Sequence, residues 1–300
     1  MTLPVHGRHH QPLTGALLAL CSMSLFSWQD ALIKLLAEDY SLFQILFIRS
    51  GVIVLPLFCI LYLRDGFRSF RTARVPDHAK RVTFNLLAFL SFYFSITRLE
   101  LGQATALVLS APLIMTALSG PLLGERASVK QAIIILIGFA GVVLVIQPIS
   151  GAVDWVGTAA ALCGAFMFAM LGIQTRSMSA TEATDLMVFF AGLTFFCLTG
   201  LIMLGNWVMP VGQDWLLLLG VGVISLFAQL CIVHAYRFAP VYILAPFEYV
   251  TILWALVLGW LMFAEIPTAL MLAGAGIIIA CGLAIVHIEH RIAPPGKIAH

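Results

Sequence analysis

The sequence predicts an all-α polytopic membrane protein with ten transmembrane helices, arranged as two inverted five-helix repeats. Three observations predict this fold: the composition, a duplicated hydrophobic pattern, and the distribution of basic residues. Of the 300 residues, 61% are hydrophobic and 10% are charged, and the mean hydropathy is +1.04. This apolar share exceeds that of ordinary soluble domains. In lipid each segment must satisfy its own backbone hydrogen bonds, so long apolar runs become helices.

Ten apolar segments are candidates for membrane spans. In order, they cover residues 13–37, 42–63, 82–97, 103–123, 131–146, 155–178, 185–205, 215–236, 241–263 and 268–287. The first is expected to remain as a helix, because it is too long for a signal peptide and lacks a small-x-small cleavage site. The basic connection 64–81 is expected to set the topology and to contact anionic headgroups.

The hydrophobic pattern occurs twice. Six residues recur at a constant shift of 142 positions: Gly15, Ala19, Leu20, Cys21, Phe26 and Lys34 match Gly157, Ala161, Leu162, Cys163, Phe168 and Arg176. The corner at Glu125 is matched by the corner at Glu265. Such repeats are typical of secondary transporters, in which two related bundles enclose a substrate site near the bilayer midplane. Because each repeat has five spans, an odd number, the second copy must enter the membrane inverted.

Basic residues predict the orientation. With a cytoplasmic amino terminus, thirteen of the sixteen Lys and Arg residues fall on the cytoplasmic side, as the positive-inside rule requires. We therefore expect a multi-pass protein of the bacterial inner membrane with both termini in the cytoplasm. The expected domains are 1–148 for the first repeat, 149–289 for the second, and 290–300 for a short cytoplasmic tail.

Four charged residues lie within the expected spans, and each is a functional hypothesis because burying an unpaired charge in lipid costs at least about 2.5–3.5 kcal/mol. They are Asp30, Lys34, Arg49 and Glu248. Asp30 and Arg49 lie at a similar depth of roughly 10 Å on antiparallel neighbours, so the two side chains are expected to meet. They would either line a vestibule for a charged solute or form a structural ion pair. Lys34 would snorkel to the headgroups.

Glu248 follows a helix-breaking proline, Pro246, which leaves a backbone carbonyl without its usual partner. A carboxylate beside such a break is a candidate proton or cation site. The alternative is a structural pair with His234 or Arg237. Pro112 in the fourth span is the matching proline, and both prolines are candidate hinges for alternating access.

Further polar and aromatic residues complete the set of candidate binding residues. Trp28 and Gln29 flank Asp30 and would stack on and hydrogen-bond a heteroaromatic solute; Gln174 and His234 are additional candidates. Small residues such as Gly141 and Gly274 permit close helix contact. That contact would lie either within one subunit or across a homodimer, and both alternatives stay open.

Several motifs are absent from the sequence. It contains no GxxxxGK[ST] loop, no HExxH, no GxSxG, and no cysteine–histidine cluster at metal-ligand spacing. We therefore expect neither an enzyme nor an ATP-driven motor, and no metal, cofactor or nucleic-acid partner. The expected partners are a small-molecule solute and the lipid bilayer. The alternative of another class is a non-transporting membrane scaffold or a lipid-modifying enzyme.

The segments Asp30–Lys34 and Phe43–Arg49, the corner Gly124-Glu125 and the duplicated five-helix unit carry a resemblance. They resemble the drug/metabolite transporter superfamily, and its EamA-domain branch in particular. The second corner departs from the family pattern, with Ala264 before Glu265. The resemblance implies a ten-helix carrier with a central cavity. Among its members, the chain most resembles bacterial carriers of vitamin-like or adenosyl metabolites, which implies uptake of a vitamin-like solute such as riboflavin. The alternative is export or exchange of amino acids, S-adenosylmethionine or related metabolites.

Overall fold

The computed structural model describes residues 12–70, 72, 74–123, 129–147, 153–178, 182, 184–203, 205, 207–238, 244 and 247–292. Within these residues the chain is helical and contains no strand. The helices of the first half are α1 (Pro12–Leu36), α2 (Leu42–Asp65), a 3-10 turn (Gly66–Phe70), α3 (Val75–Ile96), α4 (Leu101–Val108), α5 (Ala111–Leu123) and α6 (Val129–Ile146). Those of the second half are α7 (Trp155–Met178), α8 (Thr184–Met203), α9 (Asp214–Phe238), α11 (Val250–Phe263) and α12 (Ala269–Ile292).

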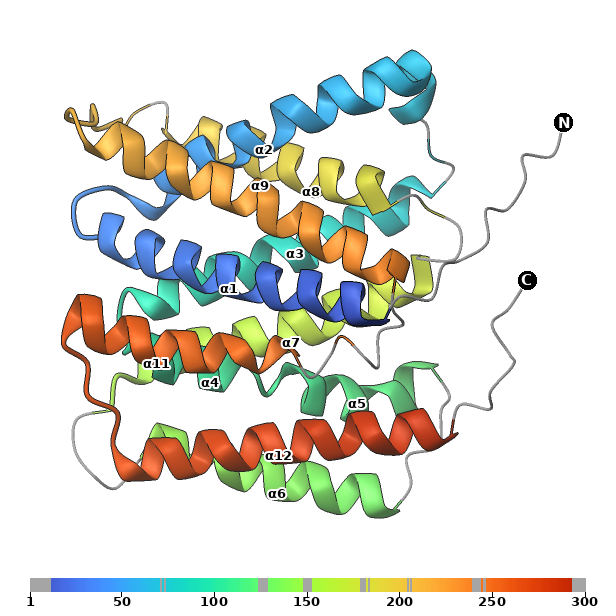
Figure 1. The fold of residues 1–300 in the computed structure, drawn as a ribbon, viewed down its shortest axis with the longest axis vertical. Coiled ribbons are helices and arrows are strands. Elements are labelled where there is room, and N and C mark those ends of the chain that lie inside the picture. The colour runs from blue at the N-terminus through green and yellow to red at the C-terminus, as the bar shows by residue number, and fades with distance from the viewer. Residues whose placement is uncertain are drawn as a thin grey trace, which may run out of the picture.

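The helices form a bundle in which α1 begins and α12 ends on the same side (Figure 1). We call this side the termini end and the opposite side, where α1 ends and α12 begins, the far end. Five helices, α1, α2, α7, α8 and α9, are long and apolar enough to cross a membrane by length and composition. Four shorter apolar segments lie at 101–115, 132–146, 250–263 and 269–285.

Helix packing has the symmetry of an inverted repeat. Span k of the first half corresponds to span k + 5 of the second, so α1 corresponds to α7, and α3 to α9. Helix α1 packs along α9, and α3 packs along α7, which are equivalent contacts. The remaining major contacts, α2 with α8 and α6 with α12, pair each span with its own counterpart. Exchanging the two halves therefore reproduces the contact pattern, and the expected two five-helix repeats are confirmed.

The fourth span, expected over 103–123 with Pro112 as a candidate hinge, is not one continuous helix. It is divided into α4 and α5 by a turn at Leu109 and Ser110, and the Ser110 hydroxyl donates to the Leu107 carbonyl at 2.6 Å. Pro112, at the second position of α5, has no N–H to continue the ladder. In the ninth span the described helix α11 begins only at Val250, after a turn at Tyr249. Pro246 and Glu125 lie outside the described residues.

Glycines bring α6 and α12 into close contact. A Cβ atom at Gly141 would lie 2.9 Å from the Gly274 carbonyl oxygen, and one at Gly274 would lie 2.6 Å from that of Gly141. Only a residue without a side chain allows this approach. The small residues singled out in the sequence therefore serve helix packing within one subunit.

Candidate functional site

A hydrogen-bonded network joins the two repeats in the middle of the bundle. The fully buried amide of Gln29 on α1 donates to the Tyr93 hydroxyl on α3 at 2.7 Å and to the Asp30 carboxylate at 3.1 Å. Its oxygen accepts a short hydrogen bond from Ser225 on α9. Buried polar groups in lipid must find such partners. Gln29 therefore links α1 and α3 of the first repeat to α9 of the second.

Arg49 on α2 extends this network. Its Nε–H donates to Ser225 Oγ at 2.9 Å, and its guanidinium lies over the rings of Phe89 and Tyr93, 5.6 and 5.5 Å from their centres. The side chain is buried, with 7% exposed. Aromatic faces attract a cation in a desolvated place. They fix the position of the guanidinium but do not neutralise its charge.

Asp30 and Arg49 do not form the direct ion pair that their similar depth predicted. Among the described residues, neither takes part in an ion pair, and the Gln29 amide and the Ser225 hydroxyl stand between them. The carboxylate remains within electrostatic reach of the guanidinium. The expectation failed because equal depth on two helices says nothing about rotation around each helix axis.

A cavity opens beside Arg49, between α2, α3, α8 and α9. It encloses about 530 Å³, including the space at its mouth. Its walls are Leu46, Arg49, Ser50 and Ile53 of α2, Arg81, Asn85 and Phe89 of α3, Val188, Ala191, Gly192 and Phe195 of α8, and Gln229 of α9. These positions follow helical spacing, so each helix presents one stripe to the cavity. The walls combine apolar and aromatic side chains with a few polar ones, as do the walls of small-molecule sites.

Arg81 is a functional candidate that the sequence did not single out. It was counted with the basic connection 64–81, yet the structure places it within α3, 9% exposed, on the cavity wall. Its Nε–H donates to Thr175 Oγ1 at 3.0 Å and one Nη1–H to the Met187 carbonyl at 2.9 Å. The sequence did carry one signal for this role: Arg81, Asn85 and Phe89 lie four residues apart.

At the far end, Lys34 forms an ion pair with Glu265 and donates to the Leu99 carbonyl at 2.7 Å. The other carboxylate oxygen of Glu265 accepts the backbone N–H of Leu101 at 2.7 Å and so caps α4. Lys34 therefore does not snorkel to the headgroups: a carboxylate from the other repeat is within reach. Glu265 follows Ala264, which ends α11 in the left-handed region at φ 55°.

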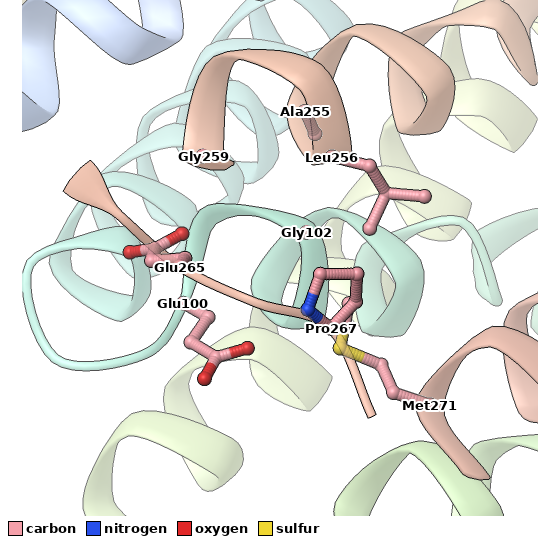
Figure 2. Close-up of a pocket in the computed structure, with 8 residues that line it drawn as sticks. All are labelled: Glu100, Gly102, Ala255, Leu256, Gly259, Glu265, Pro267 and Met271. Carbon is pink, nitrogen blue, oxygen red and sulfur yellow. The ribbon is translucent and has the colours of Figure 1, made fainter. Parts of the chain in front are cut away.

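Glu265 and Glu100 both line a small pocket of about 160 Å³ at this end. Figure 2 shows their side chains on one side of it, with Gly102, Pro267 and Met271 nearby. Burial, together with the neighbouring Glu265 carboxylate, raises the pKa of Glu100. This pocket is too small for an organic solute.

Two further contacts tie the repeats together at the far end. The Gln44 side-chain amide exchanges two hydrogen bonds with the backbone of Val208, at 2.6 and 3.1 Å. The Tyr40 hydroxyl donates to Asp214 at 2.5 Å. The far end is therefore held by contacts from the α1–α2 connection and α2 to the connection before α9 and the first residue of α9.

The termini end has an equivalent set of contacts. Glu182, between α7 and α8, accepts from Thr72 at 3.0 Å and lies 3.0 Å from His78 Nε2. The hydrogen bond from His78 is the main reason that the pKa of Glu182 is lowered. Gln174, predicted as a binding residue, lies here at 3.4 Å from Asp77 Oδ1 and does not line the cavity.

The other predicted site residues lie elsewhere. Trp28 is 43% exposed, and its ring lies 6.2 Å from that of Trp254. His234 is exposed, with Nδ1 2.8 Å from the Leu230 carbonyl oxygen, and does not pair with Glu248. Glu248 is half-buried, and its carboxylate has no hydrogen bond or ion pair among the described residues. Of the predicted binding residues, Arg49 alone lines the described cavity.

Inverted helical repeats around a cavity with polar side chains, within an apolar bundle, are typical of membrane transporters. The chain belongs to the EamA-like transporter family, whose model matches residues 13–147 and 153–287. It is therefore a small-molecule transporter of the drug/metabolite transporter superfamily and a helical membrane protein.

The alignments with curated relatives cover nearly the whole chain. A pseudopaline exporter of Pseudomonas aeruginosa is 26% identical over 273 residues, covering 91% of this chain and 95% of that protein. A riboflavin transporter of Vibrio cholerae is 26% identical over 277 residues, covering 90% and 92%. An S-adenosylmethionine uptake transporter of Rickettsia conorii is 24% identical over 283 residues, covering 93% and 94%. A solved crystal structure of 16% identity matches with a TM-score of 0.64 over 94% of this chain and 99% of that one, and shows the fold alone.

Proposed function

We propose that this protein is a secondary transporter of the bacterial inner membrane that binds a small organic metabolite in the cavity between α2, α3, α8 and α9. The observation that carries the proposal is the cavity itself: arginine and amide side chains surround open space inside a bundle whose outer surface is apolar. A scaffold has no need of such a space, because apolar side chains would fill it at a lower cost.

The contacts at the two ends support an alternating-access cycle. Lys34 and Glu265 join the repeats at the far end, whereas His78 and Glu182 join them at the termini end. In such a cycle, one set opens while the other stays closed. The positive-inside distribution favours the termini end as the cytoplasmic side.

Two solute classes follow from the relatives' names. Riboflavin uptake is the first, and the aromatic walls Phe89 and Phe195 provide faces for a planar ring. Export of a metabolite, as in the pseudopaline exporter, is the second. The two arginines in the cavity would attract an anionic solute in either direction of transport.

Counterflow in proteoliposomes tests the proposal. Vesicles with purified protein are loaded with an unlabelled solute, and entry of the same labelled solute is followed for riboflavin, S-adenosylmethionine, amino acids and carboxylates. We expect transient accumulation for at least one solute and none in protein-free vesicles. The absence of flux for every class, with folded protein in the vesicles, would favour a non-transporting scaffold.

A further inference from the structure

We propose that the transported solute is a small organic anion, with at least two negatively charged groups such as carboxylates, held between Arg49 and Arg81. The inference rests on the proposed function and names the substrate class of the same cavity. It is carried by the two guanidiniums, which line the same cavity and form no ion pair with a carboxylate in the described part of the chain.

Both guanidiniums keep unused donors. Each arginine has five N–H groups. Arg49 uses its Nε–H on Ser225, and Arg81 uses its Nε–H on Thr175 and one Nη1–H on Met187. The other N–H groups have no acceptor in the described part of the chain. Thr175 and Met187 therefore orient the Arg81 guanidinium and leave its other edge for a ligand.

The nearest acidic residues do not neutralise this pair of charges. Asp77, one turn before Arg81 on α3, is held by Arg74 at 2.8 Å. Asp30 interacts electrostatically with Arg49 but does not contact it, because Gln29 and Ser225 lie between the two side chains. Neither carboxylate lines the cavity, nor does Asp185, one turn before Val188 on α8. Arginine stays protonated in proteins, so the cavity walls keep two positive charges.

A carboxylate fits the unused edges. The planar guanidinium fork binds carboxylates with two parallel hydrogen bonds, more strongly than it binds neutral acceptors. Phe89, whose ring lies beneath Arg49, is two turns or about 12 Å from Arg81 along α3. A metabolite with two charged groups would place one at each arginine. Asn85 and Gln229 supply neutral hydrogen-bonding groups between them.

Equilibrium binding to the wild-type protein in nanodiscs tests the inference without any variant. Citrate and succinate serve as anionic probes, riboflavin as an uncharged probe and arginine methyl ester as a cationic probe. We expect saturable binding of at least one anionic probe, weakened by salt, and weaker binding of the other two. Binding of riboflavin or the cation that neither anion displaces would overturn the inference.

Variants locate the anion. Arg81→Gln and Arg49→Gln should each weaken anion binding by roughly 10- to 100-fold, because each removes a charge-assisted contact. The matched control is Lys80→Gln, which removes the same charge from the exposed neighbour and should leave the affinity unchanged. Arg81→Lys, which keeps the charge but loses the fork, should bind with intermediate affinity and covers the case in which Arg81→Gln fails to fold. Equal effects of Lys80→Gln and Arg81→Gln would contradict the proposed site.

The binding experiment and the counterflow experiment can fail independently of each other. If counterflow occurs with an uncharged solute and no anion binds, the anion inference is wrong and the transporter proposal stands. If anions bind in this cavity but no solute is exchanged in proteoliposomes, the anion-binding site stands, whereas transport through it and the transporter proposal are wrong.

Discussion

Lys34 on α1 and Glu265 after α11 form an ion pair across the interface of the two repeats, and Glu265 also caps α4. The two side chains are 13% and 15% exposed, so the pair is largely removed from water. One carboxylate thus holds three segments of the far end together.

Neutralising one partner of this pair should destabilise the protein. Lys34→Gln or Glu265→Gln leaves the other charge without its partner, at an expected cost of about 1–3 kcal/mol in the free energy of unfolding. Thermal unfolding in detergent measures it. The double variant should recover part of the loss, and a double variant that loses the full sum of the two single effects would show that the pair has no coupling.

Gly259 tests the same contact by steric means. A Cβ atom at Gly259 would lie 2.8 Å from the Glu265 carboxylate, so Gly259→Ala should displace it and lower stability by about 1–3 kcal/mol. The matched control is Gly220→Ala, which has nothing within 4 Å of the added Cβ and should be neutral or stabilising by up to about 1 kcal/mol. Equal unfolding temperatures for the two variants would contradict the close contact.

The stability of the folded protein should depend on pH through Glu182 at the termini end. Its pKa is lowered in the folded protein, chiefly by the hydrogen bond from His78, with Thr72 and Arg74 contributing. A lowered carboxyl pKa adds stability above the unfolded value, near 4.5, and that stability is lost as the pH falls through the folded value. Glu182→Gln should therefore lower the unfolding temperature at pH 6–7 and have less effect below about pH 4. A difference that is constant across this range would refute the assignment.

Glu248 is proposed as a coupling site because its carboxylate lies half-buried beside a helix break without a described partner. Glu248→Gln keeps the size of the side chain but cannot titrate. We expect normal amounts of folded protein, loss of pH-gradient-driven accumulation, and retained downhill exchange. Undiminished accumulation across the same gradient would make Glu248 a structural residue.

Much of the fold could be predicted from the sequence, because lipid turns each long apolar run into a helix and an odd number of spans inverts the second repeat. Pro112 marked a candidate hinge in the fourth span, but hydropathy did not predict the turn at Leu109 and Ser110 that divides it. Of the network, Gln29 and Arg49 stood out as polar residues in apolar spans, whereas Ser225 carries no such signal. Arg81 was hidden because its charge resembles those that set topology. The Lys34–Glu265 pair joins residues 231 positions apart, and no local pattern predicts it.

Blocking the cavity tests the central claim, that solute passes between α2, α3, α8 and α9. Ala191 lines the cavity, so Ala191→Phe fills part of its space. Leu201→Phe places a large side chain on the same helix at a position that is 66% exposed. Counterflow in proteoliposomes is measured for both variants after folding is checked by thermal unfolding. We predict loss of flux for Ala191→Phe and parental flux for Leu201→Phe. A folded Ala191→Phe protein that transports at the parental rate would contradict this account.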